Sequence, residues 1–238
     1  MIDLSIVIPC YNEGENIIPL FKKIDDLLLK NSNIEIIIVN NGSTDSTKKT
    51  ILNSGLYKNN KIKVFEIEHN IGYGHGIMMG VKIASGENIG WCHADLQTEP
   101  EDVVNAFLKN SEKLKNEQVI IKGLRKNRNL FDQIFTFGMS IISSIIFLRI
   151  INDINAQPKL FPKNFRNYLI DYPNDFSLDL YLLIIAKIKK YKIINHNVIF
   201  KKRLHGEAKG GGSMKVKIKL IKRTLIYMFK LRKAIWKL

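Results

Sequence analysis

The sequence predicts an α/β fold in which a mainly parallel central sheet is flanked by helices. Apolar, β-branched runs alternate with helical segments four times, and this alternation is typical of right-handed crossovers between parallel strands. The run at 34–39 is apolar almost throughout, as in strands that are covered by helices on both faces. A length of 238 residues and a hydrophobic content of 45% are enough for one large domain.

The expected elements follow the chain in order. We expect strands at 4–9, 34–39, 62–67, 89–92, 119–124 and 193–200, and helices at 15–29, after Pro100, at 180–190 and at 215–238. The expected domain covers residues 1–209, and residues 210–238 are expected to form a glycine-rich linker and a basic amphipathic helix. Cys10 and Cys92 lie in or beside strands, so we expect small core residues rather than a disulfide or a metal site.

The positive charge is concentrated near the C-terminus. The formal net charge is +15, and the segment from Lys201 onward contains thirteen Lys and Arg residues and one acid, Glu207. A charge of this size indicates an anionic partner: a nucleic acid, an anionic membrane surface or a phosphorylated substrate. No recognised nucleic-acid-binding fold accompanies the basic segment, so we expect no nucleic-acid partner.

The most informative stretch is N-I-G-W-C-H-A-D-L-Q-T-E-P at 88–100. A short apolar run ends in His93, Asp95 and Gln97, and Pro100 then opens a helix. These side chains follow the carboxyl end of a predicted strand, which is the edge where open α/β sheets bind ligands. Carboxylate and carboxamide oxygens suit a hard divalent cation that also grips a diphosphate. The alternative is a polar strand-to-helix loop whose acid caps the helix.

A glycine-rich stretch between 70 and 86 includes Gly72, Gly74 and Gly76. Its spacing suggests a dinucleotide site, but that fingerprint follows the first strand, where this chain has P-C-Y-N-E. We therefore reject a dinucleotide site. We expect these glycines to let the backbone approach a ligand or a neighbouring strand closely.

Four motifs together resemble the successive signatures of the family 2 inverting glycosyltransferases. They are V-I-P-C-Y-N-E at 7–13, V-N-N-G-S-T-D-S-T at 39–47, N-I-G-Y-G-H-G at 70–76 and H-A-D-L-Q at 93–97. The resemblance implies the GT-A fold and transfer of a sugar from a nucleotide diphosphate sugar, with Mg²⁺ or Mn²⁺ as cofactor. In motif pattern the chain is most similar to the polyprenyl-phosphate (dolichol-phosphate) mannose synthases.

The resemblance also implies a nucleotide-sugar site. Pro9, Tyr11 and Glu13 match the motif that lines the nucleoside. Asn40 and Asn41 stand where the family usually has the two acids of V-D-D-G-S, and an amide can still hydrogen-bond a base edge. The remaining residues implied to bind the donor are Gly72, Gly76, Asp95, Arg125, Arg203 and Lys209.

The implied metal ligands are Asp95, Gln97 and His93. Asp95 is retained from the family's D-x-D motif and is expected to be the catalytic metal and diphosphate ligand. Gln97 matches the last residue of D-A-D-L-Q in the mannose synthase branch. His93 replaces the first acid; it could bind Mn²⁺ but is a poorer ligand for Mg²⁺. The alternative for His93 is a hydrogen-bonded residue that never contacts metal.

Three further segments match the acceptor side of that branch. Residues 153–161, D-I-N-A-Q-P-K-L-F, resemble D-x-x-S-G-F-R-L-Y, and residues 203–209, R-L-H-G-E-A-K, resemble R-x-x-G-x-S-K. Arg203 and Lys209 would then grip the diphosphate or the acceptor phosphate. Asp179 matches an acid that is implied to be a general base, or it is only a charge at a helix N-terminus. Arg125, in G-L-R, either reaches a phosphate or the acceptor or is a solvated surface residue.

Two segments bear on membrane attachment. The apolar run at 134–151 falls short of the roughly 18–20 uncharged residues of a spanning helix, so we expect either a core helix or an interfacial helix. In 215–238, basic residues recur at helical spacing beside Tyr227, Phe229 and Trp236. This pattern predicts a helix that binds an anionic membrane surface or one that docks on the domain.

We therefore expect an inverting glycosyltransferase that is cytoplasmic and peripheral on the inner face of a membrane. Its acceptor would be lipid-linked or a glycan, in cell-surface polysaccharide or glycolipid biosynthesis. One alternative is a polyprenyl-phosphate sugar synthase, whose acceptor phosphate is already anionic and needs no base. Another is a catalytically decayed module that binds membrane or nucleic acid, which the replacement of family acids by Asn40, Asn41 and His93 suggests.

Overall fold

The structure is a computed structural model, and it describes residues 2–128, 130–205 and 214–235. The strands are β1 (Leu4–Cys10), β2 (Ile34–Asn41), β3 (Ile62–Ile67), β4 (Asn88–Trp91), β5 (Val119–Lys126), β6 (Lys159–Pro162) and β7 (Lys192–Ile199). The helices are α1 (Gly14–Lys30), α2 (Thr47–Asn53), α3 (Tyr73–Ile83), α4 (Pro100–Asn116), α5 (Leu130–Phe147), α6 (Leu178–Ile188) and α7 (Met214–Ile235), with short 3₁₀ helices at Leu56–Lys58 and Lys163–Tyr168.

The strands form one seven-stranded sheet in the order β3-β2-β1-β4-β6-β5-β7. Neighbouring strands pair in parallel except at β6, which is antiparallel to both β4 and β5. The expectation of a mainly parallel α/β sheet is therefore confirmed. The strand β6 was not expected, because the sequence around it was assigned only to an acceptor-side segment.

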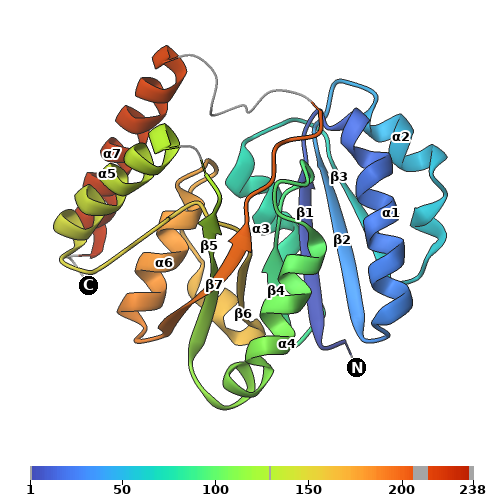
Figure 1. Cartoon of the computed structure of the whole chain (residues 1–238), viewed down its shortest axis with the longest axis horizontal. Coiled ribbons are helices and arrows are strands. Elements are labelled where there is room, and N and C mark those ends of the chain that lie inside the picture. Colours follow the sequence, from blue (N-terminus) through green and yellow to red (C-terminus); the bar gives the residue numbers. More distant parts are fainter. Residues whose placement is uncertain (1, 129, 206–213, 236–238) are drawn as a thin grey trace.

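Alternate residues of each strand enter two separate cores. In β1 and β2, Ile6 and Ile38 face a core built with α1 and α4, whereas Val7 and Ile37 face one built with α3 and α6. This period of two is the geometry of an extended chain. With apolar side chains on both faces, the central strands are covered on both sides, as their continuous apolar sequence predicts (Figure 1).

The helices α5 and α7 pack side by side at one end of the molecule (Figure 1). Met228 of α7 is fully buried against the core, and the Ser143 hydroxyl of α5 lies 3.7 Å from its Sδ. The basic helix is thus docked on the domain, one of the two arrangements the sequence allowed. Trp236, Lys209 and the linker at 210–213 lie outside the described residues. Among the helices that the structure describes, none is long and apolar enough to cross a membrane.

A buried acid at the start of β2 ties three segments together. The Glu35 carboxylate accepts hydrogen bonds from the hydroxyls of Ser5 and Ser85 at 2.6 and 2.8 Å and pairs with the Lys63 ammonium at 2.7 Å. Burial acts to raise the pKa of Glu35, but these partners outweigh it and lower the pKa to about 2. The ionised carboxylate therefore stabilises the folded state, fully above the unfolded pKa near 4.5 and less as the pH falls toward 2.

Replacing Glu35 with Gln should lower the free energy of unfolding at pH 7 by about 1–3 kcal/mol, since it leaves buried donors without their charged acceptor. The deficit relative to wild type should shrink as the pH falls below about 4.5. Urea unfolding between pH 7 and pH 2.5 measures it, with Glu68→Gln, whose side chain is 89% exposed, as the matched control. A deficit that stays constant with pH would contradict the assigned role of the Glu35 charge.

Candidate active site

A cavity of about 520 Å³ opens at the carboxyl ends of β1 and β4. From β1 the chain runs to β2 and β3 on one side of the sheet, and β4 then returns to the other side of β1. Such a switch point is where open α/β sheets bind ligands. A second hollow, of about 560 Å³, lies between α1 and residues 54–59 and is lined by none of the predicted site residues.

Most of the predicted site residues meet in this cavity. Those that line it are Pro9, Tyr11, Glu13, Asn41, Gly72, His93, Asp95, Gln97, Arg125, Asp179 and Arg203. Asn40 and Gly76 are not among the lining residues. The Asn40 amide donates to Glu66 at 2.9 Å and accepts from the backbone N–H of Ser43 at 3.3 Å, so both of its ends are used within the fold. Lys209 lies outside the described residues.

Asp95 is a buried residue that lines the cavity, and it is paired with an arginine. Its Oδ2 lies 2.6 Å from Nη2 of Arg203, and its Oδ1 accepts a hydrogen bond of 3.1 Å from the backbone N–H of Gln97. The other side of the guanidinium lies 3.9 Å from the carboxylate of Glu13. Arg203 is therefore held between two acids at the place where the sequence predicted a diphosphate.

The protein side chains at this site could bind a divalent metal only together with a bound diphosphate. No cluster of three or more His, Cys, Asp or Glu side chains that could hold a metal occurs in the described part of the chain. Asp95 is the buried carboxylate at the predicted site, and the Gln97 amide donates to the Lys201 carbonyl at 3.3 Å. Mg²⁺ is commonly bound by one or two carboxylates plus substrate phosphates, so the residues present fit a cation that a diphosphate completes.

The Tyr73 hydroxyl connects His93, Gln157 and Asp179. It lies 3.0 Å from Nε2 of His93, donates to Oδ2 of Asp179 at 3.2 Å and accepts from Nε2 of Gln157 at 3.1 Å. Because its single proton goes to the carboxylate, Nε2 of His93 must be the donor of the remaining contact. Burial lowers the pKa of His93, so the ring is neutral at neutral pH. Its Nδ1 then carries the lone pair that a metal would need.

Asp179 is buried in the first turn of α6 and is surrounded by donors. Its Oδ1 lies 3.0 Å from the ammonium of Lys159 and 3.0 Å from Nε2 of Gln157. Lys159 is also fully buried and donates to the carbonyls of Ile154 and Ala156 at 2.9 and 2.7 Å. The carboxylate thus has a buried counter-charge, and protonating it would leave that ammonium uncompensated.

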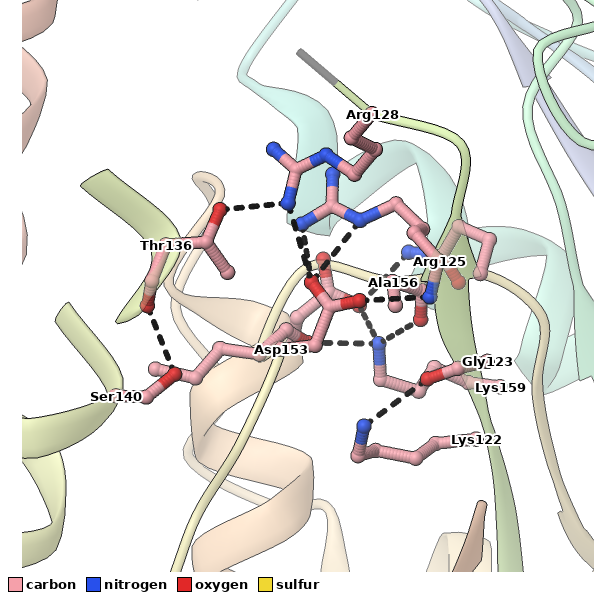
Figure 2. Close-up of polar contacts among 12 residues, drawn as sticks. Lys122, Gly123, Arg125, Arg128, Thr136, Ser140, Asp153, Ala156 and Lys159 are labelled. Carbon is pink, nitrogen blue, oxygen red and sulfur yellow. Dashed lines mark hydrogen bonds and ion pairs between the residues drawn. The ribbon is translucent and has the colours of Figure 1, made fainter. Parts of the chain in front are cut away.

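The rim beside β5 carries a cluster of ions around Asp153 (Figure 2). Asp153 accepts hydrogen bonds from the backbone N–H and the guanidinium of Arg125, and Nη1 of Arg128 lies 3.8 Å away and donates to Thr136 of α5 at 2.8 Å. The Arg125 side chain is only 11% exposed, so it is not the solvated surface residue that the sequence left open. Burial, with the charge of Lys159, lowers the pKa of neighbouring Lys122 to about 7.

Two glycines permit close backbone approaches that shape the cavity. A Cβ on Gly123 would lie 2.0 Å from the carbonyl oxygen of Gln157, and one on Gly72, where φ is +143°, would lie 2.2 Å from the carbonyl oxygen of Asn174. Gly72 thus packs on the loop at 173–175 and also lines the cavity, whereas Gly76 lies against the Asn41 side chain of β2, a neighbouring strand as expected. Cys10 and Cys92 are buried free thiols in the core, as predicted.

Several lining residues were not predicted. They are Tyr73, Asp175, Phe176, Gln157 and Arg223, among others. Tyr73 stacks on Phe176 with ring centroids 4.6 Å apart, and Arg223 of α7 reaches Asp175 at 2.8 Å. Tyr73 lies within a motif that we singled out for its glycines. Gln157 lies within the segment 153–161 that we matched to the acceptor side, at a position to which we gave no role. Asp175, Phe176 and Arg223 carry no local signal, because their partners are distant in the sequence.

Comparison with known proteins gives consistent matches. Residues 5–149 match the model of the family described as Glycosyl transferase family 2. A dodecaprenyl-phosphate galacturonate synthase of Rhizobium johnstonii is 30% identical over 132 residues, which cover 53% of this chain but only 37% of that relative. A dolichyl-phosphate beta-glucosyltransferase of Trichomonas vaginalis is 26% identical over 246 residues, covering 94% of this chain and 73% of that protein.

The fold also matches a solved structure. Glucosyl-3-phosphoglycerate synthase of Mycobacterium tuberculosis, solved with Mn²⁺, UDP and glucosyl-3-phosphoglycerate, superposes with a TM-score of 0.73 over 97% of this chain and 79% of that one. The sequence identity is 15%, so this match bears on the fold alone, which is the GT-A fold expected from the motifs. The family match covers more than half of the chain, and the protein therefore belongs to glycosyl transferase family 2.

Proposed function

We propose that this glycosyltransferase transfers a sugar, with inversion, from a nucleotide diphosphate sugar to a lipid phosphate at a membrane surface. The observation that carries the proposal is the group formed by the buried Asp95 and the partly exposed Arg203 and Glu13 at the switch point of the sheet. The printed names of two relatives, which act on dodecaprenyl and dolichyl phosphates, support the choice of acceptor.

The nucleotide sugar would lie across the carboxyl ends of the strands, with its nucleoside at β1 and β2. Pro9 and Asn41 line the end of the cavity at β1 and β2, where the amide oxygen of Asn41 is buried without a partner among the described residues. That oxygen would accept a hydrogen bond from the base or ribose. The diphosphate would lie against Arg203, whose charge stabilises the leaving nucleoside diphosphate.

A divalent cation, Mg²⁺ or Mn²⁺, would be held by Asp95 together with the diphosphate, with His93 and Gln97 as further candidates. When bound, it would neutralise charge that develops on the leaving group. To admit it, Asp95 must exchange its contact with Arg203 for one with the metal. Arg203 would then be free to pair with a phosphate, as guanidinium groups do in fork geometry.

The acceptor side favours an acceptor that is already anionic. Asp179 would need to take a proton if the acceptor were a hydroxyl group, at the cost of leaving Lys159 buried without its counter-ion. A lipid phosphate requires no such step. A glycan hydroxyl with Asp179 as general base remains the second candidate, and the paired variants described below separate the two.

Asp95→Asn should abolish metal-dependent donor binding and reduce turnover at least 100-fold, because an amide is a much weaker ligand than a carboxylate. Calorimetric titration with UDP-glucose, GDP-mannose and the corresponding diphosphates, with and without Mn²⁺, measures the binding. Asp102→Asn, which alters an acid at the start of α4 outside the cavity, is the control. Mn²⁺-dependent binding that survives in Asp95→Asn would exclude Asp95 as the metal anchor.

Asp179→Asn alone should destabilise the fold by about 3–5 kcal/mol, because it leaves the Lys159 ammonium buried without a counter-ion. The double variant Asp179→Asn with Lys159→Met removes both charges and should recover most of that stability. If the acceptor is a lipid phosphate, the double variant should keep turnover within about tenfold of wild type. A folded double variant that loses about 10²–10⁴ in kcat would instead identify Asp179 as a general base.

We further propose that α5 faces the membrane. An exposed apolar stripe on this helix is formed by Ile134, Phe137, Ile141 and Ile145, and Leu148 extends it just past the end of the helix. These residues recur at helical spacing on the face opposite Ser143, which packs against α7. The neighbouring α7 exposes Lys219, Lys222, Lys230 and Lys233. Apolar residues beside exposed lysines suit the interface of an anionic bilayer.

Replacing Ile134, Phe137 and Ile145 together with Gln should reduce co-sedimentation with vesicles of phosphatidylglycerol and phosphatidylcholine by at least tenfold. Rising salt should weaken wild-type binding only in part, because screening acts on the charges and not on apolar insertion. The matched control replaces Leu29, Leu52 and Leu108, equally exposed leucines on other helices. Equal loss in both triple variants, or in neither, would refute a specific membrane face on α5.

A further inference from the structure

Gln157 lies in the segment 153–161 that matches the acceptor side, but neither that match nor the proposed reaction gives this residue a role. It lies in the loop before β6, its side chain is 2% exposed, and it lines the cavity that holds Asp95 and Arg203. Its backbone is fixed by the close approach of Gly123. A buried carboxamide at this position can hydrogen-bond neighbouring protein groups or a ligand. Its amide nitrogen and its amide oxygen differ in this respect.

The amide nitrogen of Gln157 is fully used within the protein. Nε2 donates one hydrogen bond to Oδ1 of Asp179 at 3.0 Å and another to the Tyr73 hydroxyl at 3.1 Å. These contacts also settle the orientation of the amide, because a flipped side chain would place its oxygen against the carboxylate of Asp179. The oxygen must therefore point away from Asp179.

The amide oxygen of Gln157 is buried and has no hydrogen-bond partner among the residues that the structure describes. Buried acceptors are normally satisfied, since leaving one without a donor is unfavourable. An oxygen of this kind accepts from a hydroxyl or an N–H, and it repels phosphate oxygens, which carry no proton to donate. A hydroxyl or an N–H of a ligand in the cavity would supply the missing donor.

The order of the strands indicates which part of the ligand lies there. The sheet places β2 and β1 with Asn41 and Pro9 first, then β4 with Asp95, then β6 with Gln157. If the nucleoside lies over the first pair and the diphosphate at Asp95, the next group along the cavity is the sugar. Sugars carry several hydroxyl groups, and a hydroxyl can donate the hydrogen bond that the amide oxygen of Gln157 lacks.

We propose that the amide oxygen of Gln157 accepts a hydrogen bond from a hydroxyl of the transferred sugar and so sets the sugar specificity of the enzyme. This inference rests on the proposed function, because it requires a nucleotide sugar in the cavity. The hydrogen bonds to Asp179 and Tyr73 hold the amide in place. The site then selects sugars with a free hydroxyl at the contacted position and rejects analogues that lack it, because the buried oxygen would stay unpaired.

The test compares Gln157→Met with wild type by calorimetric titration in the presence of Mn²⁺. The probes are UDP, GDP, UDP-glucose and GDP-mannose, followed by the 2-, 3-, 4- and 6-deoxy forms of the nucleotide sugar that binds most tightly. The variant should bind the nucleoside diphosphate within about twofold of wild type and bind the nucleotide sugar roughly 10- to 100-fold more weakly. One deoxy form should bind wild type roughly 10- to 100-fold more weakly than its parent nucleotide sugar does. The same deoxy form should bind the variant as tightly as the parent does.

In that case the effects of the substitution and of the missing hydroxyl on affinity are not additive, as a direct contact requires. If Gln157 had only a structural role, each deoxy form would lose the same affinity, relative to the parent sugar, in both proteins. Should Gln157→Met fail to fold, Gln157→Asn withdraws the oxygen by one methylene and carries the same expectations. Equal binding of the nucleotide sugar by wild type and variant would overturn the inference alone. If wild type binds none of the probes, the proposed function fails as well.

Discussion

The antiparallel insertion of β6 between β4 and β5 is the constraint on which the site depends. The parallel strands all end at one edge of the sheet, and an antiparallel strand begins at that same edge. The loop that precedes β6 therefore enters the cavity that follows β4. This insertion places Gln157 on the lining of the cavity that also contains Asp95, and it places Lys159 at the start of β6, within 3.0 Å of Asp179.

Charge pairing within the cavity follows from its burial. Asp95 pairs with Arg203, Asp179 with Lys159, and Asp153 with Arg125, and each of these acids is nearly inaccessible to solvent. Buried ions are tolerated only when they are compensated and hydrogen-bonded. The cations of these pairs differ in exposure: the Lys159 side chain is fully enclosed, whereas the Arg203 side chain is 18% exposed and lines the cavity.

The sequence predicted the parallel strands and the placement of Asp95, because apolar runs that end in polar residues are local signals. It did not reveal β6, which has only four residues, starts with Lys159 and ends with Pro162, and so lacks the length and composition of a typical strand. It also missed the contacts of Tyr73 with Asp179, which are 106 residues apart in the chain. Such pairs are set by the tertiary fold, and no local pattern encodes them.

The fold already uses some side-chain atoms of the residues that the motifs singled out. Asn40 matches a donor-binding motif, yet its side chain is committed to Glu66 and Ser43. His93 stands in a metal motif, yet its Nε2 is committed to Tyr73. The hydrogen-bond partners of each residue therefore decide what it can bind.

A crystal structure of the protein with Mn²⁺ and a nucleotide sugar that binds it would test the central claim most directly. We expect the diphosphate to lie between Arg203 and a metal held by Asp95, with the nucleoside toward Asn41 and the sugar toward Gln157. A nucleotide bound in the hollow between α1 and residues 54–59, or an Asp95–Arg203 pair unchanged beside a bound diphosphate, would contradict it.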